Sequence, residues 1–221
     1  MEYTIKIKSI VPRTHDVRSY RCEKPGNYHF IPGQATEVSI NKPGWEDEKR
    51  PFTFTSLNDD DDLEFTIKSY LDHPGVTNEL YRLKEGDELI VRDVWGAIEY
   101  KGPGYFIAGG AGITPFIAIL RQLHKEGKID NNKLFFSNKT DKDIILEREL
   151  DSILGTNLIN VVTKDPGTKH FAGYINEAFL KEHVEDFSRK FYLCGPAPMV
   201  ETMQALLHGL GASPDAVVFE K

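Results

Sequence analysis

Hydrophobic and polar positions alternate in short stretches through the first hundred residues, and turn residues interrupt these stretches. Alternation with a period of two is typical of strands that bury one face. It predicts strands over residues 4–10, 34–40, 50–56, 63–70, 89–92 and 97–100. Polar residues 58–62 separate two of these strands, so 50–56 and 63–70 are expected to form a hairpin. Many short strands at regular spacing indicate an all-β barrel or sandwich.

A helical segment over residues 76–83 interrupts the β pattern. Thr77 or Asn78 is suited to cap its start, because the side-chain oxygen of either residue accepts a bond from a free backbone amide. The start of such a helix suits an anion. The same helix would equally serve as a lid over the bottom of the barrel, and the pattern leaves both interpretations open.

From Gly102 onward, strand and helix patterns alternate, which is typical of parallel strands joined by crossover helices. The expected strands are 105–108, 133–137, 158–163, 191–194 and 217–219, and the expected helices are 115–126, 143–154, 176–183 and 197–210. The sequence therefore predicts two domains, an antiparallel barrel over residues 1–101 and an α/β domain over residues 102–221.

Composition narrows the possible functions. A net charge of −7 argues against broad binding to nucleic acid, which needs basic surfaces. No apolar run is long enough to span a bilayer, and the first residues resemble a strand rather than a signal peptide. Cys22 and Cys194 cannot hold an iron–sulfur cluster by themselves. The two cysteines lie far apart in sequence, so we expect a reducing, cytoplasmic location. The histidines show no metal-binding spacing, so we expect no metal.

A glycine-rich turn at residues 109–115 joins a predicted buried strand to a predicted helix. Gly110 and Gly112 permit a tight turn and a close approach of the backbone to a ligand. Pro115 lies just inside the helix, where a missing N–H costs nothing. Free amides and the helix dipole at such a turn suit a diphosphate. Glycine-rich turns also occur for structural reasons alone.

Two further stretches are candidates for chemistry. Cys194 follows a predicted strand of the parallel sheet, and ligands bind at the carboxyl ends of such strands. The alternative interpretation is that Cys194 packs in the core as a small hydrophobic residue. In the barrel, Arg50 suits a phosphate, Phe52 suits stacking on a flat heterocycle, and Thr53 can bond a ring edge. The alternative is a strand with a surface arginine and a core phenylalanine.

Taken in order, these stretches resemble the motifs of the ferredoxin–NADP⁺ reductase superfamily, and the resemblance covers essentially the whole chain. Members join an antiparallel flavin-binding barrel to a nucleotide-binding α/β domain. The matching motifs are Arg50-Pro51-Phe52-Thr53, Gly75-Val76-Thr77, Gly110-Ala111-Gly112-Ile113-Thr114-Pro115 and Cys194-Gly195-Pro196. Most relatives have tyrosine where this chain has Phe52, so one hydrogen bond to the flavin is lost here.

The resemblance implies a role for each motif. Arg50 would hold the flavin diphosphate, Phe52 and Pro51 would lie beside the flavin ring, and Thr53 would bond its edge. Other expected flavin-binding residues are Lys68, Tyr70, Gly75, Val76, Thr77 and, as the aromatic near the C-terminus, Phe219. The nicotinamide nucleotide would be bound by Gly110, Gly112, Ile113, Thr114, Pro115, Lys164, Cys194, Gly195 and Pro196. Thr53 and Cys194 would flank the reacting atoms.

The resemblance also implies cofactors and partners. FAD rather than FMN is the expected cofactor, and NADH or NADPH is the donor. Residues 135–146 resemble the NADH-using cytochrome reductases, whereas Lys164 lies where NADPH-using members bind a phosphate. Electrons would pass to a separate acceptor such as ferredoxin, flavodoxin or a cytochrome. The alternatives are an NAD(P)H:flavin reductase, with free flavin or another small molecule as acceptor, and a non-catalytic regulatory subunit.

Overall fold

The computed structural model describes residues 1–96 and 98–219, and the strands in these ranges form two six-stranded sheets. The first sheet is antiparallel, in the order β4-β3-β6-β1-β2-β5. Its strands are β1 (Tyr3–Pro12), β2 (Val17–Glu23), β3 (Ala35–Ile40), β4 (Arg50–Thr53), β5 (Asp62–Lys68) and β6 (Glu88–Trp95). A bridge between Phe54 and Phe65 joins the two edges, so the sheet closes into the predicted barrel.

The second sheet is parallel and has the order β10-β9-β8-β7-β11-β12. Its strands are β7 (Gly104–Gly109), β8 (Lys133–Asn138), β9 (Leu158–Val162), β10 (Phe171–Ala172), β11 (Lys190–Cys194) and β12 (Val217–Phe219). Its helices are α2 (Thr114–Lys125), α3 (Glu147–Leu154), α4 (Glu177–His183) and α5 (Ala197–Gly209). The antiparallel and α/β parts confirm the predicted fold class.

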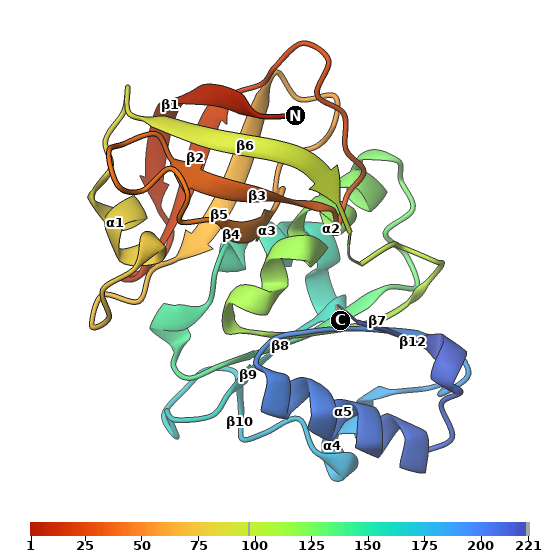
Figure 1. The fold of residues 1–221 in the computed structure, drawn as a ribbon. Helices are drawn as coiled ribbons and strands as arrows, with labels where there is room; N and C mark the ends of the chain where they lie inside the picture. Colours follow the sequence, from red (N-terminus) through yellow and green to blue (C-terminus); the bar gives the residue numbers. More distant parts are fainter. Residues whose placement is uncertain (97, 220–221) are drawn as a thin grey trace.

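Helices cover both faces of the parallel sheet, with α2 and α3 on the side of the barrel and α4 and α5 on the other side (Figure 1). Successive side chains of β7 therefore enter different cores. Phe106 packs with Phe116 of α2, whereas Tyr105 packs with Phe179 of α4. Because both faces are covered, every residue of β7 is buried and the strand has no polar face.

Some details of the predicted strands differ from the structure. The segments 50–56 and 63–70 pair only next to the loop between them, where Phe54 bridges Phe65 and the Thr55 amide donates a 2.8 Å hydrogen bond to the Glu64 carbonyl, whereas β4 and β5 lie at opposite ends of the strand order. Residues 98–100 are not in a strand, and Ala97 lies outside the described residues. Strands β2 and β10 were not predicted. The proposed domain boundary at Gly102 lies in the connection between β6 and β7.

The short helix α1 (Val76–Arg82) packs against one end of the barrel. Val76 and Leu80 enter the barrel core, and the Tyr20 hydroxyl donates a 3.0 Å hydrogen bond to the Leu80 carbonyl. The helix therefore covers the barrel as a lid would. The predicted cap is wrong, because Gly75 is the N-cap residue and no side chain bonds the free amides. No helix among the described residues is long and apolar enough to cross a membrane.

Candidate functional site

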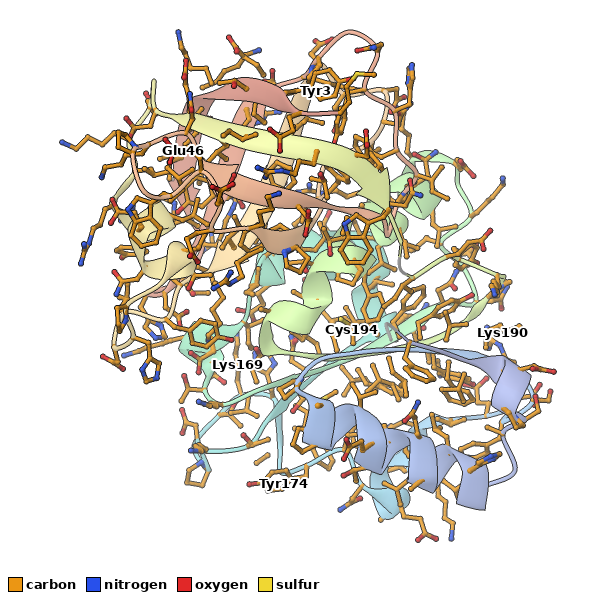
Figure 2. All side chains as sticks on the ribbon, viewed as in Figure 1. Tyr3, Glu46, Lys169, Tyr174, Lys190 and Cys194 are labelled. Atoms are coloured by element: carbon orange, nitrogen blue, oxygen red, sulfur yellow. The ribbon has the colours of Figure 1, made fainter. Side chains whose placement is uncertain are left out.

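Two cavities lie side by side between the barrel and the parallel sheet. The first has a volume of about 260 Å³ and the second about 530 Å³. The residues that line both are Lys68, Tyr70, Ala111 and Cys194. A ligand in the second cavity would therefore lie next to a ligand in the first cavity. Figure 2 shows Cys194 in this middle region.

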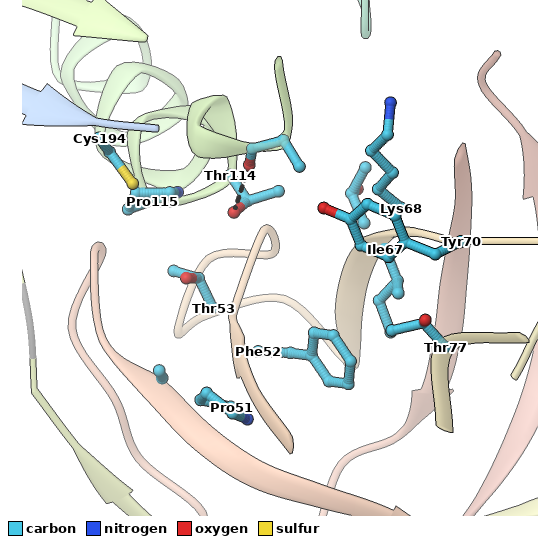
Figure 3. Close-up of a pocket in the computed structure, with 13 residues that line it drawn as sticks. Pro51, Phe52, Thr53, Ile67, Lys68, Tyr70, Thr77, Thr114, Pro115 and Cys194 are labelled. Carbon is cyan, nitrogen blue, oxygen red and sulfur yellow. Dashed lines mark hydrogen bonds between the residues drawn. The ribbon is translucent and has the colours of Figure 1, made fainter. Parts of the chain in front are cut away.

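The barrel wall of the first cavity comes from the ends of β4 and β5. Pro51, Phe52 and Thr53 line it from β4, and Thr66 and Ile67 line it from β5 (Figure 3). Phe52 is half-buried against the barrel core, so its ring has a fixed support. Hydroxyl groups beside a flat apolar side chain suit a heterocycle that is apolar on its faces and polar at its edge.

A half-buried charge pair lies at the junction of the two cavities. The Lys68 ammonium group contacts the Asp16 carboxylate at 2.8 Å. Burial would raise the pKa of Asp16, but hydrogen bonds from Lys68 and Thr14 lower it below its ordinary value. The pair holds the Lys68 side chain in place, and its position suits an anionic or carbonyl-bearing ligand. Asp16 was not predicted, because a lone aspartate in a polar loop carries no motif.

The glycine-rich turn forms the opposite wall. Residues Gly110–Ile113 form the short 3₁₀ helix η1, and α2 begins directly after it. Gly112 packs so tightly on the strand end of β11 that an added Cβ would lie 2.3 Å from the Cys194 carbonyl oxygen. This glycine therefore permits contact between two protein loops. Ala111, Thr114 and Pro115 reach the first cavity from this turn.

Cys194 connects the two sides of the site. It ends β11 and pairs with Ala108 at the end of β7, so both strand ends open on the same crevice. Cys194 and Thr53 line the same cavity, one from each half of the molecule (Figure 3). The two residues expected to flank the reacting atoms are thus placed together, and their catalytic role stays a prediction.

The second cavity extends from Cys194 to the end of β8. Gly195, Pro196 and Met199 line it on one side, and Asn138 and Lys139 on the other. The Asn138 carbonyl accepts hydrogen bonds from the Thr163 amide and hydroxyl at 2.9 and 3.2 Å, which fixes the ends of β8 and β9 together. Asn138, Lys139 and Met199 were not among the predicted site residues. Their position directly after parallel strands was the available signal.

Several predicted residues do not line either cavity. Val76 and Ile113 are buried in the two cores, and Phe219 packs against the core beside α5. Lys164 is exposed beyond β9, and Gly75 precedes α1, from which only Thr77 reaches the first cavity. The side chains of Val76 and Ile113 fill the cores and that of Phe219 packs beside α5, so only their backbone groups are left to bind a ligand in the first two cases. The binding roles of all three residues stay predictions.

Arg50 also lies outside both cavities. Its guanidinium group is exposed, donates a 2.6 Å hydrogen bond to the Lys49 carbonyl and lies 3.7 Å from the Glu48 carboxylate. These exposed contacts are weak and exchange readily with solvent. The predicted role of Arg50 as a phosphate ligand stays a prediction.

The chain was compared with known families, proteins and structures. Residues 106–205 match the family described as the oxidoreductase NAD-binding domain. The chain is 29% identical to NADH-cytochrome b5 reductase 2 of Mycosarcoma maydis, over 92% of this chain and 63% of that protein. It is 27% identical to the propane 2-monooxygenase reductase component of Rhodococcus jostii, over 98% of this chain and 62% of that protein. The chain thus spans about three fifths of the length of these two relatives.

Among solved structures, the fold is similar to a ferredoxin NADP⁺ reductase of Neisseria gonorrhoeae with bound FAD and NADP. The TM-score is 0.87 at 19% identity, and the match covers 99% of this chain and 98% of that chain. The antiparallel barrel, the parallel sheet and the crevice between them define a two-domain fold, and the α/β part matches the NAD-binding family. The chain therefore has the fold of the ferredoxin NADP⁺ reductase, and its residues 106–205 match the oxidoreductase NAD-binding domain.

Proposed function

We propose that this chain is a FAD-dependent NAD(P)H oxidoreductase that passes electrons to a separate acceptor. The observation that carries the proposal is that Thr53 of the barrel and Cys194 of the α/β part line one cavity between the two halves. The names of the two curated relatives, a cytochrome b5 reductase and a monooxygenase reductase component, support the same class of activity.

The first cavity fits a flavin ring by the chemistry of its wall. Phe52 offers an apolar face, Thr53 and Thr66 offer hydroxyl groups, and Lys68 offers an ammonium group for a polar edge. Bound FAD would supply the conversion of a two-electron donor into single electrons. The chain would orient the ring and exclude water from the face toward Cys194. Exposed Arg50 would be free to turn toward a phosphate.

The second cavity fits a nicotinamide nucleotide. Its wall contains Gly110 and Gly112 of η1, directly before α2, where backbone amides and the helix dipole favour a diphosphate. We propose NADH as the preferred donor, because Lys164 lies outside the cavity and is exposed. One exposed lysine contact with a phosphate contributes about 1 kcal/mol at most.

The acceptor in this proposal is a separate ferredoxin, flavodoxin or cytochrome. The chain would work in the cytoplasm, where its cysteines stay reduced. Cys22 is buried in the barrel core, and burial raises the pKa of its thiol to about 12. It is a packing residue rather than a nucleophile.

Anaerobic reduction of the purified, FAD-reconstituted protein tests the proposal. NADH is expected to bleach the visible flavin absorbance rapidly, and NADPH more slowly. Failure to bind FAD, or a bound flavin that neither nucleotide reduces, would reject the proposed function. A flavin that dissociates freely and turns over as a substrate would favour the flavin reductase alternative. Steady NADH oxidation with ferricyanide would exclude a regulatory subunit without activity.

A further inference from the structure

A buried ion network joins the barrel to α2, far along the helix from the glycine-rich turn. Arg121 of α2 donates a 2.7 Å hydrogen bond to the Glu64 carboxylate of β5 and a 2.5 Å bond to the Thr55 carbonyl of the barrel. Its other nitrogens bind both carboxylate oxygens of Glu149 in α3, at 2.5 and 3.0 Å. The Arg121 guanidinium group therefore connects α2 and α3 to two segments of the barrel, β5 and the residues after β4.

The network has the buried Glu64 at its centre, is partly exposed at its ends and is balanced in charge. Side chains of Arg121 and Glu64 are 20% and 10% exposed, and Arg13 adds a second cation 3.7 Å from Glu64. Burial would raise the pKa of Glu64, but the charge and hydrogen bonds of Arg121 lower it below its ordinary value. A buried carboxylate with two cationic neighbours stays ionised, and loss of one partner leaves an uncompensated charge.

The same network continues to the wall of the first cavity. The Thr55 hydroxyl donates a 2.9 Å hydrogen bond to Glu64 and lies 3.2 Å from the Thr66 hydroxyl. Thr66 lines the cavity beside Phe52 and Thr53. A continuous set of hydrogen bonds therefore connects the barrel cavity to α2, and α2 begins at the turn that lines the nucleotide cavity.

A second cross-contact on the same helix provides a natural comparison. Lys125 of α2 pairs with Asp59 of the barrel, but both side chains are more than half exposed. Exposed pairs contribute little to geometry or stability. If the buried network fixes the two halves, loss of Arg121 and loss of Lys125 must therefore have different consequences.

We propose that Arg121 is a positioning residue: its contacts with Glu64 and Glu149 hold the glycine-rich turn at a fixed distance from the barrel cavity. This inference rests on the proposed function, because the distance so fixed is that between the nicotinamide and the flavin. A displacement of about 1 Å between reacting groups lowers a rate by roughly 100-fold. A positioning role therefore acts on the hydride step more than on the binding of either ligand.

Rapid-reaction measurement of flavin reduction tests this role in the FAD-reconstituted protein. Arg121→Met is expected to lower the limiting rate at saturating NADH by about tenfold or more, with flavin content and NADH affinity largely kept. Arg121→Lys should recover part of the rate, and Lys125→Met should match the wild type. An unchanged limiting rate in Arg121→Met, or an equal loss in Lys125→Met, overturns the proposal.

Scanning calorimetry of the flavin-free protein gives a readout that does not depend on activity. Wild type and Lys125→Met are expected to unfold in one transition, and Arg121→Met in two separated transitions, because the halves uncouple. A single transition in Arg121→Met overturns the proposal. Should Arg121→Met fail to fold, Glu149→Gln replaces it in both measurements. If NADH does not reduce wild-type flavin, the proposed function fails, and calorimetry alone decides whether Arg121 joins the halves.

Discussion

Cys194 lies at the end of β11, where the two cavities meet. We expect Cys194→Ala to lower the limiting rate of flavin reduction by NADH by about tenfold to 100-fold, because a small side chain no longer positions the nicotinamide. NADH affinity should change little. The limiting rate of Cys194→Ser should lie between those of the wild type and Cys194→Ala. The measurement is anaerobic stopped-flow reduction over a range of NADH concentrations.

Cys22→Ala is the matched control, because Cys22 is buried in the barrel core and lines neither cavity. It should lower the unfolding temperature and leave the limiting rate unchanged. The proposed role of Cys194 would be wrong if Cys194→Ala weakened NADH binding while the limiting rate stayed at the wild-type value.

Lys68 is the second residue on which the site depends, because it lines both cavities and pairs with Asp16. Lys68→Met is expected to raise the dissociation constant for NADH by about tenfold, the loss of one charge-assisted hydrogen bond. It also leaves the Asp16 carboxylate without its ammonium partner, so the pKa of Asp16 should rise. Equilibrium titration of the oxidised protein with NAD⁺, and of the flavin-free protein with NADH, measures the affinity.

Lys8→Met removes another lysine of the barrel, which pairs with Asp62 on the surface away from the cavities. Its nucleotide affinity should equal that of the wild type. Equal affinities in Lys68→Met and Lys8→Met would show that Lys68 does not contact the nucleotide.

At the scale of elements, the turn between β7 and α2 is limited by its contact with β11. We expect Gly112→Ala to displace this turn, because the new Cβ would lie 2.3 Å from the Cys194 carbonyl oxygen. The variant should bind FAD normally and lose nucleotide affinity, with a lower unfolding temperature. Gly26→Ala, where an added Cβ meets nothing within 4 Å, should behave as the wild type in both measurements. Normal NADH affinity in Gly112→Ala would contradict this account of the turn.

The elements differ in how far the sequence could predict them. The strands and helices after Gly104 follow strong periodic patterns and were predicted within a few residues, apart from the two-residue β10. Strand β2 was missed, because Arg18 and Arg21 obscure its apolar positions. The predicted hairpin of segments 50–56 and 63–70 is limited to the residues beside its loop, because β4 and β5 diverge to opposite ends of the strand order.

The site was predicted best where a motif lies at a strand end, as at Thr53 and Cys194. Asp16, Glu64 and Arg121 carry no local signal, because their importance comes from partners far away in the chain. In sequence, Arg121 and Glu64 look like ordinary surface charges. Only tertiary packing makes them buried partners.

At the scale of the whole molecule, the junction between the halves contains both apolar and ionic contacts. Val17 of the barrel packs into the core formed by α2 and the parallel sheet, beside Phe116 and Leu120. The contribution of such apolar burial does not depend on pH. The Glu64 and Arg121 pair does so only while Glu64 is ionised, so the junction should weaken in acid.

Glu64→Gln tests this pH dependence. The folded pKa of Glu64 lies below its ordinary value of 4.5, so the ion pair stabilises the protein above that pH. At pH 7 the variant should lose about 3 kcal/mol of unfolding free energy, because a buried pair loses its anion. As the pH falls through the folded pKa, Glu64 becomes protonated in the wild type and the difference should shrink. Urea unfolding at several pH values measures it.

Glu185→Gln is the control, since its pair with Lys133 leaves the carboxylate mostly exposed. It should change stability little at any pH, because solvent screens an exposed pair. A difference between wild type and Glu64→Gln that stays constant into acid would show that packing, rather than charge, is lost in the variant. The junction would then depend on the packing of the Glu64 side chain rather than on its charge. Of the ion pairs of Arg121, only the one with Glu149 would then contribute.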